Sequence, residues 1–149
     1  MELKDYIDDE NIDLNFEAKN KEEALKKLAI LISKNRNVDS EKVLKVLKDR
    51  EELGSTGIGN GVAIPHGKLE IEKDIIGAIA ISKNGVEFAS IDSKPVHIFF
   101  VFISSPSSTT AHLRILAKVS KLLMDEKIRS SLTNANSIEE LKMILTNGG

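Results

Sequence analysis

The stretch from Arg50 to Gly67 holds the residues of this chain best suited to chemistry. Glycine weakens regular elements, but it lets the backbone adopt positive φ or approach a ligand closely. The N–H groups of a glycine-rich loop can form a concave site for an anion. We therefore predict an anion site on this loop. Its candidate binding residues are Gly57, Gly59, Asn60 and Gly61.

One histidine, His66, follows this loop. The apolar triplet Val62–Ile64 predicts a short strand, and Pro65 ends it because proline cannot donate to a ladder. His66 is then expected just past the strand, with Gly67 leaving one side open. A neutral imidazole is a nucleophile near neutral pH, and phosphoryl transfer needs mainly positioning and charge stabilisation. The pattern favours a histidine that carries a phosphoryl group. The alternative is a loop histidine that has no catalytic function.

Arg50 is the nearest cation before the loop. In a helix that begins at Asp39 or Ser40, Val43, Leu47 and Arg50 follow the spacing i, i+4 and i+7. This spacing predicts that Arg50 lies on the buried side, where a charge is usually paired or directed at a ligand. Its guanidinium can fork onto phosphate oxygens.

Two more histidines have different expected roles. His112 falls in the first turn of a helix that begins near Thr109, where free N–H groups favour anions. It is a candidate hydrogen-bond donor to a phosphoryl group, and the alternative is a surface or core-edge histidine. His97 lies in the apolar run Pro95–Ile103, so we expect it to be buried, bonded to the backbone and outside the site.

Two other kinds of site fit the residues poorly. Gly54 and Gly59 match the outer spacing of a nucleotide P-loop, but Asn60 and Gly61 stand where lysine and serine or threonine are required. A strand is also expected after the loop, where a P-loop needs a helix. The three histidines, 31 and 15 residues apart, match no local zinc motif, and cysteine is absent. We expect no metal and no cofactor.

Length and composition predict one ordinary globular domain, residues 1–149, with 41% hydrophobic residues. A net charge of −2 gives no electrostatic case for nucleic acid. The longest apolar run, Ile98–Ile103, is far shorter than the roughly 20 residues that span a bilayer. The acidic N-terminus, with Glu2 and Asp5, is unlike a signal peptide. We expect a cytoplasmic protein without membrane insertion.

The periodicity of apolar residues predicts an α/β domain with a mixed sheet of about five strands and helices on both faces. A hairpin is expected at Lys83–Gly85, joining the strands 75–81 and 86–88. The expected strands are 12–16, 62–64, 75–81, 86–88 and 95–103, and the expected helices are 20–34, 39–50, 109–124, 126–132 and 137–145. The helix 109–124 is expected to bury Leu113, Leu116, Ala117, Ser120 and Leu123.

The motif Gly57–Gly67, preceded by Arg50 and Glu51, resembles the signature of enzyme IIA of the bacterial phosphotransferase system. The resemblance is to the fructose/mannitol class, which includes the nitrogen-regulatory type, and it extends through Asp92–Val96 and Ala111–Leu113. It implies the same sandwiched fold, a phosphoryl group accepted on Nε2 of His66, and His112 beside it. Some relatives carry glutamate at the position of Asn60, whose role is therefore open.

The resemblance implies the histidine-containing phosphocarrier protein as the phosphoryl donor. In the transport branch the recipient is an enzyme IIB and finally a sugar. In the nitrogen-regulatory branch the protein controls partners through its phosphorylation state. The loop Glu52–Gly61 is similar to the nitrogen type, yet transport-type IIA also occurs as a lone domain, so both functions stay open.

Overall fold

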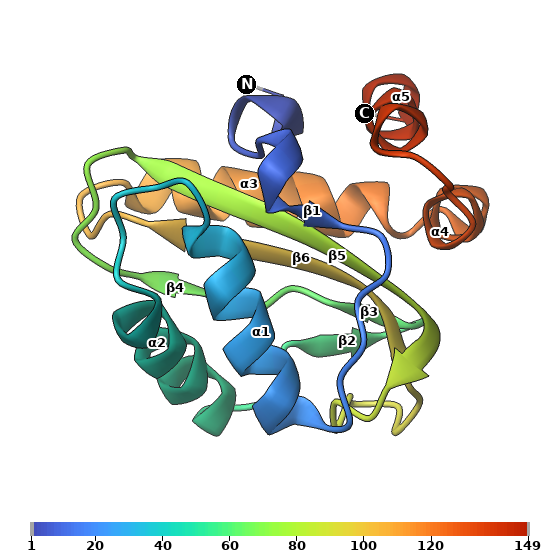
Figure 1. Ribbon diagram of the computed structural model, residues 1–149, viewed down its shortest axis with the longest axis horizontal. Helices are drawn as coiled ribbons and strands as arrows, with labels where there is room; N and C mark the ends of the chain where they lie inside the picture. Colours follow the sequence, from blue (N-terminus) through green and yellow to red (C-terminus); the bar gives the residue numbers. More distant parts are fainter. Residues whose placement is uncertain (1, 149) are drawn as a thin grey trace.

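A mixed sheet of six strands forms the centre of the computed structural model, which describes residues 2–148 (Figure 1). The strand order is β1-β5-β6-β3-β2, and β4 pairs with β6 beyond the end of β3. Only β2–β3 and β5–β6 are antiparallel. The strands are β1 (Ile12–Asp13), β2 (Gly57–Gly59), β3 (Val62–Ala63), β4 (His66–Lys68), β5 (Ile75–Val86) and β6 (Val96–Ser104). The predicted fold class is confirmed.

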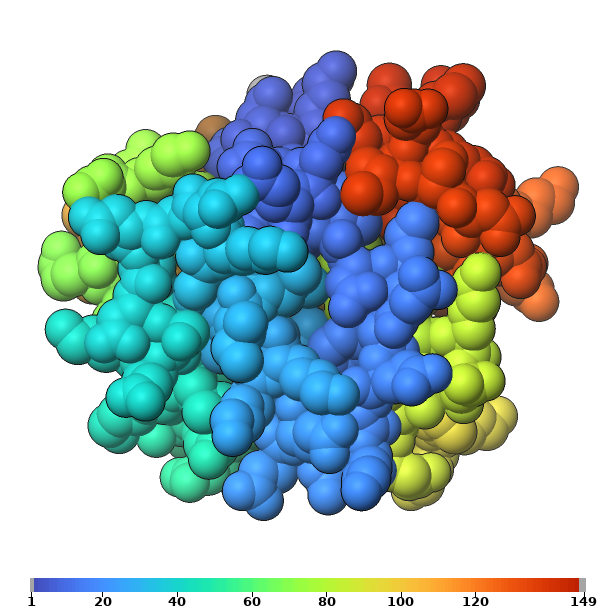
Figure 2. Space-filling model, in the orientation of Figure 1, coloured from blue at the N-terminus to red at the C-terminus, as the bar shows by residue number. Residues whose placement is uncertain are grey.

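Helices cover both faces of this sheet, as predicted. In Figure 1 the helices α1 and α2 lie in front of the sheet, and α3 lies behind it. The helices are α1 (Lys21–Ser33), α2 (Ser40–Glu52), α3 (Thr109–Leu122), α4 (Glu126–Thr133) and α5 (Ile138–Gly148). Figure 2 shows side chains of the N-terminal third spread over the front face. No helix within residues 2–148 is long and apolar enough to cross a membrane.

The central strand β6 is buried on both faces because it serves two separate cores. Phe99, Val101 and Ile103 pack with the apolar residues of α1 and α2. Phe100 and Phe102 point the other way and pack with α3 and the C-terminal helices. Alternating side chains along one strand thus join both helical layers to the sheet.

The first two helices begin where their capping residues predict. The side chain of Asn20 accepts a hydrogen bond from the N–H of Glu23 (2.9 Å), and that of Asp39 accepts one from Glu41 (2.9 Å). These contacts satisfy backbone donors that have no partner within the first turn. The start and direction of α2 matter for the site, because this helix carries Arg50 at its far end.

The predicted hairpin at Lys83–Gly85 is wrong. These residues form a bulge inside one long strand, β5, whose register with β6 shifts between Ile81 and Val86. The N–H of Gly85 donates to Oγ of Ser82 (3.1 Å), which closes the bulge locally. Gly85 adopts a φ of +84°, which favours glycine at this position. The antiparallel partner of β5 is β6, reached through the following loop.

Two smaller predictions also need correction. The strand expected over 12–16 is only two residues long, Ile12–Asp13. In α3 the buried side chains are His112, Ile115, Val119 and Leu122, whereas Leu113, expected in the core, is 61% exposed. Both sets of residues follow helical spacing. Of the predicted residues, Leu123 is buried and Leu116 packs partly buried against the same core, so the buried face differs from the predicted one mainly by including His112 and excluding Leu113.

The segment Ala89–Ser93 covers the outer edge of β2. The N–H of Ile91 donates to the carbonyl oxygen of Gly57 (3.0 Å). A Cβ at Gly57 would lie 2.3 Å from Oγ of Ser90, so the two segments are in close contact there. The edge strand β2 therefore has part of its hydrogen-bonding edge covered by another segment of the same chain.

Candidate functional site

His66 lies just past β3, as predicted, and it is the first residue of a further short strand, β4. The chain leaves the ladder at Ile64 and Pro65, where the N–H of Ile64 donates to the carbonyl oxygen of Thr56 (3.0 Å). The carbonyl oxygen of Ile64 then accepts a hydrogen bond from Nδ1 of His66 (2.7 Å). Since a carbonyl can only accept, the proton of the neutral ring is on Nδ1. Nε2 therefore carries the lone pair.

The packing of β4 on α2 determines where His66 points. A Cβ at Gly67 would lie 2.2 Å from Cγ1 of Val46, so glycine allows the strand to touch this helix. Side chains alternate along a strand, and His66 and Lys68 therefore point away from α2, toward α3. Arg50 lies one helical turn beyond Val46, on the same side of α2.

Arg50 reaches the site from the end of α2. Its Nη1 donates to the carbonyl oxygen of Gly54 (2.9 Å), and the residue is half-buried rather than fully buried. Burial is the main cause that lowers the pKa of His66, and the positive charge of Arg50 lowers it further, against the opposing effect of the bond to Ile64. His66 is therefore neutral near pH 7. The guanidinium is close enough for its charge to act on the imidazole.

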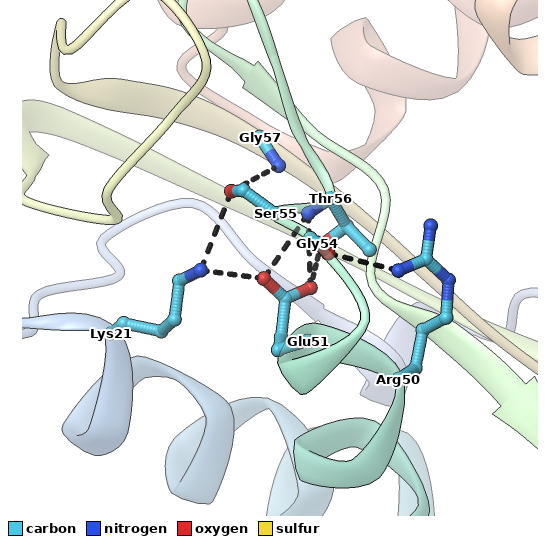
Figure 3. A network of polar contacts seen from close by, with 7 residues as sticks. All are labelled: Lys21, Arg50, Glu51, Gly54, Ser55, Thr56 and Gly57. Atoms are coloured by element: carbon cyan, nitrogen blue, oxygen red, sulfur yellow. Dashed lines mark hydrogen bonds and ion pairs between the residues drawn. The ribbon is translucent and has the colours of Figure 1, made fainter.

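Glu51, the residue after Arg50, holds the loop that leads from α2 to the site (Figure 3). Its carboxylate pairs with Nζ of Lys21 (2.7 Å) and accepts from the N–H of Thr56 (3.1 Å) and from its hydroxyl. The side chain of Glu51 is only 5% exposed. The network fixes Gly54 and Thr56, which contact Arg50 and Ile64 respectively. Sequence reasoning missed this anchor.

His112 lies next to His66, as predicted. The centroids of the two rings are 5.4 Å apart, with a 60° angle between the ring planes. His112 is 5% exposed, and Oγ of Ser104 is hydrogen-bonded to its Nδ1. Burial, followed by the charges of His66 and Lys68, lowers the pKa of His112 to about 4. Both imidazoles are therefore neutral at pH 7.

Lys68 is a site residue that sequence reasoning missed. Its Nζ donates to Oγ1 of Thr109 (2.9 Å), the first residue of α3. Strand alternation was the available signal, because residues 66 and 68 of one strand share a face. Arg50 and Lys68 thus place positive charge near two neutral imidazoles. Such a site suits an anion bound to Nε2 of His66.

The glycine-rich hairpin lies away from His66. Along β6, Val62 is opposite Ile98 and His66 is opposite Phe102, a separation of about 13 Å at roughly 3.3 Å per residue. The turn at residues 59–61 lies still farther along, beyond Val62. The structure therefore does not bring Gly59, Asn60 and Gly61 together with His66, and Gly57 lies opposite Ala63 with its N–H bonded to Oγ of Ser55 (3.0 Å).

Asn60 has a structural role at this turn. It adopts a φ of +58°, and its N–H donates to the carboxylate of Asp92 (3.1 Å). The hydrogen bond from the N–H of Lys94, and to a lesser extent the one from Asn60, lowers the pKa of Asp92. The turn is thus too far from His66 for Gly59, Asn60 and Gly61 to contact a phosphoryl group bound there.

His97 is bonded to the backbone, as expected. Its Nδ1 donates to the carbonyl oxygen of Ser82 (2.8 Å), although the residue is half-buried rather than buried. It belongs to the hairpin end of β6, together with Gly61, and not to the site around His66. Within residues 2–148 no three histidine, aspartate or glutamate side chains are grouped so that they could hold a metal ion.

A family model described as "Phosphoenolpyruvate-dependent sugar phosphotransferase system, EIIA 2" matches residues 5–148. The chain is 35% identical over 152 residues to a nitrogen regulatory protein of Klebsiella oxytoca, covering 100% of this chain and 93% of the relative. It is 33% identical over 138 residues to a fructose-specific EIIABC component of Bacillus subtilis. That match covers 92% of this chain but 22% of the larger protein.

The fold has a solved counterpart. The crystal structure of nitrogen regulatory protein IIA-Ntr from Neisseria meningitidis superimposes with a TM-score of 0.88 at 33% sequence identity. The match covers 95% of this chain and 97% of that structure. The similarity therefore includes the whole arrangement of sheet and helices that positions His66.

Proposed function

Because the chain belongs to the EIIA 2 family of the phosphoenolpyruvate-dependent sugar phosphotransferase system, we propose that it carries a phosphoryl group on His66. Members of this family are phosphotransferase components that work through a phosphohistidine. The observation that carries the assignment to this residue is the bond from Nδ1 of His66 to the carbonyl oxygen of Ile64. It leaves Nε2 as the nucleophile, beside His112 and within the field of Arg50.

The transfer step follows from this arrangement. Nε2 of His66 attacks the phosphorus of a phosphorylated donor histidine, and the P–N bond of the donor breaks as the new P–N bond forms. Nδ1 keeps its proton and continues to donate it in the hydrogen bond to the carbonyl oxygen of Ile64. The partial negative charge of that oxygen partly compensates the positive charge that develops on the ring. Arg50 and Lys68 stabilise the phosphoryl oxygens, and His112 donates a hydrogen bond to them.

The donor we propose is the histidine-containing phosphocarrier protein, and the recipient is an enzyme IIB of a fructose- or mannitol-type sugar transporter. This exchange would take place in the cytoplasm. Incubating the protein with phosphoenolpyruvate, enzyme I and the phosphocarrier protein should add one phosphoryl group per chain, measured by intact mass. A chain that gains none under conditions that phosphorylate a control IIA protein would overturn the proposal.

Nitrogen regulation is a second candidate, favoured by the near full-length similarity to the nitrogen regulatory proteins. Here the phosphorylation state would control the binding of partner proteins. Offering the phosphorylated protein to isolated IIB domains separates the two functions. Transfer to a IIB supports the carrier, whereas retention of the phosphoryl group with every IIB, together with phosphorylation-dependent capture of a target protein, supports regulation.

We expect Arg50→Lys to slow phosphoryl transfer about tenfold, because lysine keeps the charge but loses the planar fork that grips two oxygens. Folding should be unchanged, since lysine can still donate to the carbonyl of Gly54. A single-turnover transfer rate and a melting curve measure the two effects. Lys48→Gln, on the exposed side of the same helix, is the control and should transfer at the native rate. A native rate for Arg50→Lys would restrict Arg50 to a structural role.

A further inference from the structure

We propose that Ser104 is a positioning residue that holds His112 in the tautomer with its proton on Nε2. The effect on transfer rests on the proposed function of His66, whereas the tautomer itself does not. Ser104 ends β6 and is fully buried, and its Oγ is hydrogen-bonded to Nδ1 of His112. Since Nδ1 is bonded to Ser104, Nε2 is the ring nitrogen of His112 that is available to a group bound to His66.

The direction of this hydrogen bond follows from the hydroxyl. Within residues 2–148, His112 is the only hydrogen-bond partner found for Oγ of Ser104. If the hydroxyl accepted a proton from Nδ1, its own O–H would be left without an acceptor in a fully buried place, which is unfavourable. If the hydroxyl donates, the O–H is satisfied and Nδ1 supplies the lone pair. The neutral ring must then carry its proton on Nε2.

A neighbouring contact holds the same turn of α3. Lys68 is paired with Ser104 across β4 and β6, so both side chains leave the sheet on the same face. Nζ of Lys68 donates to Oγ1 of Thr109, and Ser104 contacts His112 three residues later. The N–H of His112 also donates to the carbonyl oxygen of Ser108 (2.9 Å). The turn is thereby fixed at both ends, and of these three hydrogen bonds only the one with Ser104 is made to the imidazole ring.

The tautomer decides whether His112 attracts or repels a phosphoryl group. With the proton on Nε2, the ring presents a donor to the phosphoryl oxygens on His66. With the proton on Nδ1, it would present a lone pair to the same oxygens. A ring that can exchange between the two forms is a poorer donor, because part of its population faces the anion with the wrong atom.

The test is the nitrogen-15 spectrum of the imidazoles in the unphosphorylated native protein and in Ser104→Ala at pH 7. Native His112 should show one tautomer, with an unprotonated and hydrogen-bonded Nδ1. In Ser104→Ala the Nδ1–H form should appear, and the two nitrogen shifts should move toward each other. Ser104→Thr, which keeps the hydroxyl, should restore the native spectrum. A native spectrum with the proton on Nδ1, or an unchanged spectrum in Ser104→Ala, overturns the proposal.

The transfer rate gives a second readout. Ser104→Ala should slow single-turnover transfer to His66 by roughly two- to tenfold, the range set by one neutral hydrogen bond. Ser82→Ala is the matched control, because Ser82 is also a buried strand serine whose hydroxyl accepts from the N–H of Gly85. It should leave the His112 spectrum and the rate unchanged. If native protein accepts no phosphoryl group, the proposed function fails, but the spectrum still decides the role of Ser104.

Discussion

Replacing His66 by alanine should abolish phosphoryl acceptance, and the variant should keep its unmodified mass however long it is incubated with phosphoenolpyruvate, enzyme I and the phosphocarrier protein. No other imidazole can substitute. Nδ1 of His112 is bonded to Ser104, and that ring is 5% exposed. His97 lies at the opposite end of β6, bonded to Ser82. The phosphoryl group on the native protein should be lost in acid and kept in alkali, as a phosphohistidine is.

His97→Ala is a matched control for His66→Ala. Both histidines are half-buried, and both donate from Nδ1 to a backbone carbonyl, that of Ser82 or Ile64. The two substitutions therefore remove the same kind of contact, but only one removes the proposed acceptor. His97→Ala should accept one phosphoryl group at the native rate. Labelling that persists in His66→Ala, or that disappears in a folded His97→Ala, contradicts the assignment.

Replacing His112 by alanine should slow transfer by roughly ten- to a thousandfold, the range for removing one donor to developing charge. The substitution takes away the Nε2–H that faces His66, but it leaves the nucleophile and both cations in place. The final extent of phosphorylation therefore stays at one group per chain. Glutamine has an amide donor of similar reach, and His112→Gln should have a rate between those of the alanine variant and the native protein.

Single-turnover rates and melting curves for both His112 variants separate catalysis from folding. His112 is buried in the first turn of α3, so alanine also removes packing against the sheet. Ser120→Ala, two turns farther along the same helix, reports the effect of a small truncation outside the site. A native rate for His112→Ala, or a folded variant that never accepts phosphate, would exclude the role of His112 as a supporting donor.

The meeting of His66, His112 and Arg50 was predictable in part. Helical spacing from Val43 through Leu47 correctly placed Arg50 at the end of α2, although it is half-buried. The position of His112 in a first helical turn was also correct. Neither observation gives the distance between the three residues. That distance depends on the parallel pairing of β4 with β6. A strand of only three residues has too little sequence pattern for this pairing to be predicted.

The misplaced features share a physical cause, which is that local patterns do not specify their tertiary partners. Lys83–Gly85 has the composition of a turn, and the same positive φ at Gly85 serves a bulge equally well. In α3 the buried face includes His112, which is hydrogen-bonded to Ser104, and leaves Leu113 exposed, a rotation that helical spacing alone does not specify. The glycines after Arg50 do form a tight hairpin, but its turn lies at the wrong end of β3 to reach His66.

A sheet with an uncovered border recruits the strands of other molecules, and this pairing is a common start of fibre growth. Here the edge strand β2 is already partly covered, since the N–H of Ile91 donates a hydrogen bond to the carbonyl oxygen of Gly57 and Ser90 packs against that glycine. At the opposite border β1 is two residues long, too short to guide a foreign strand. Neither edge of the sheet therefore offers a long free strand to a second copy of the protein.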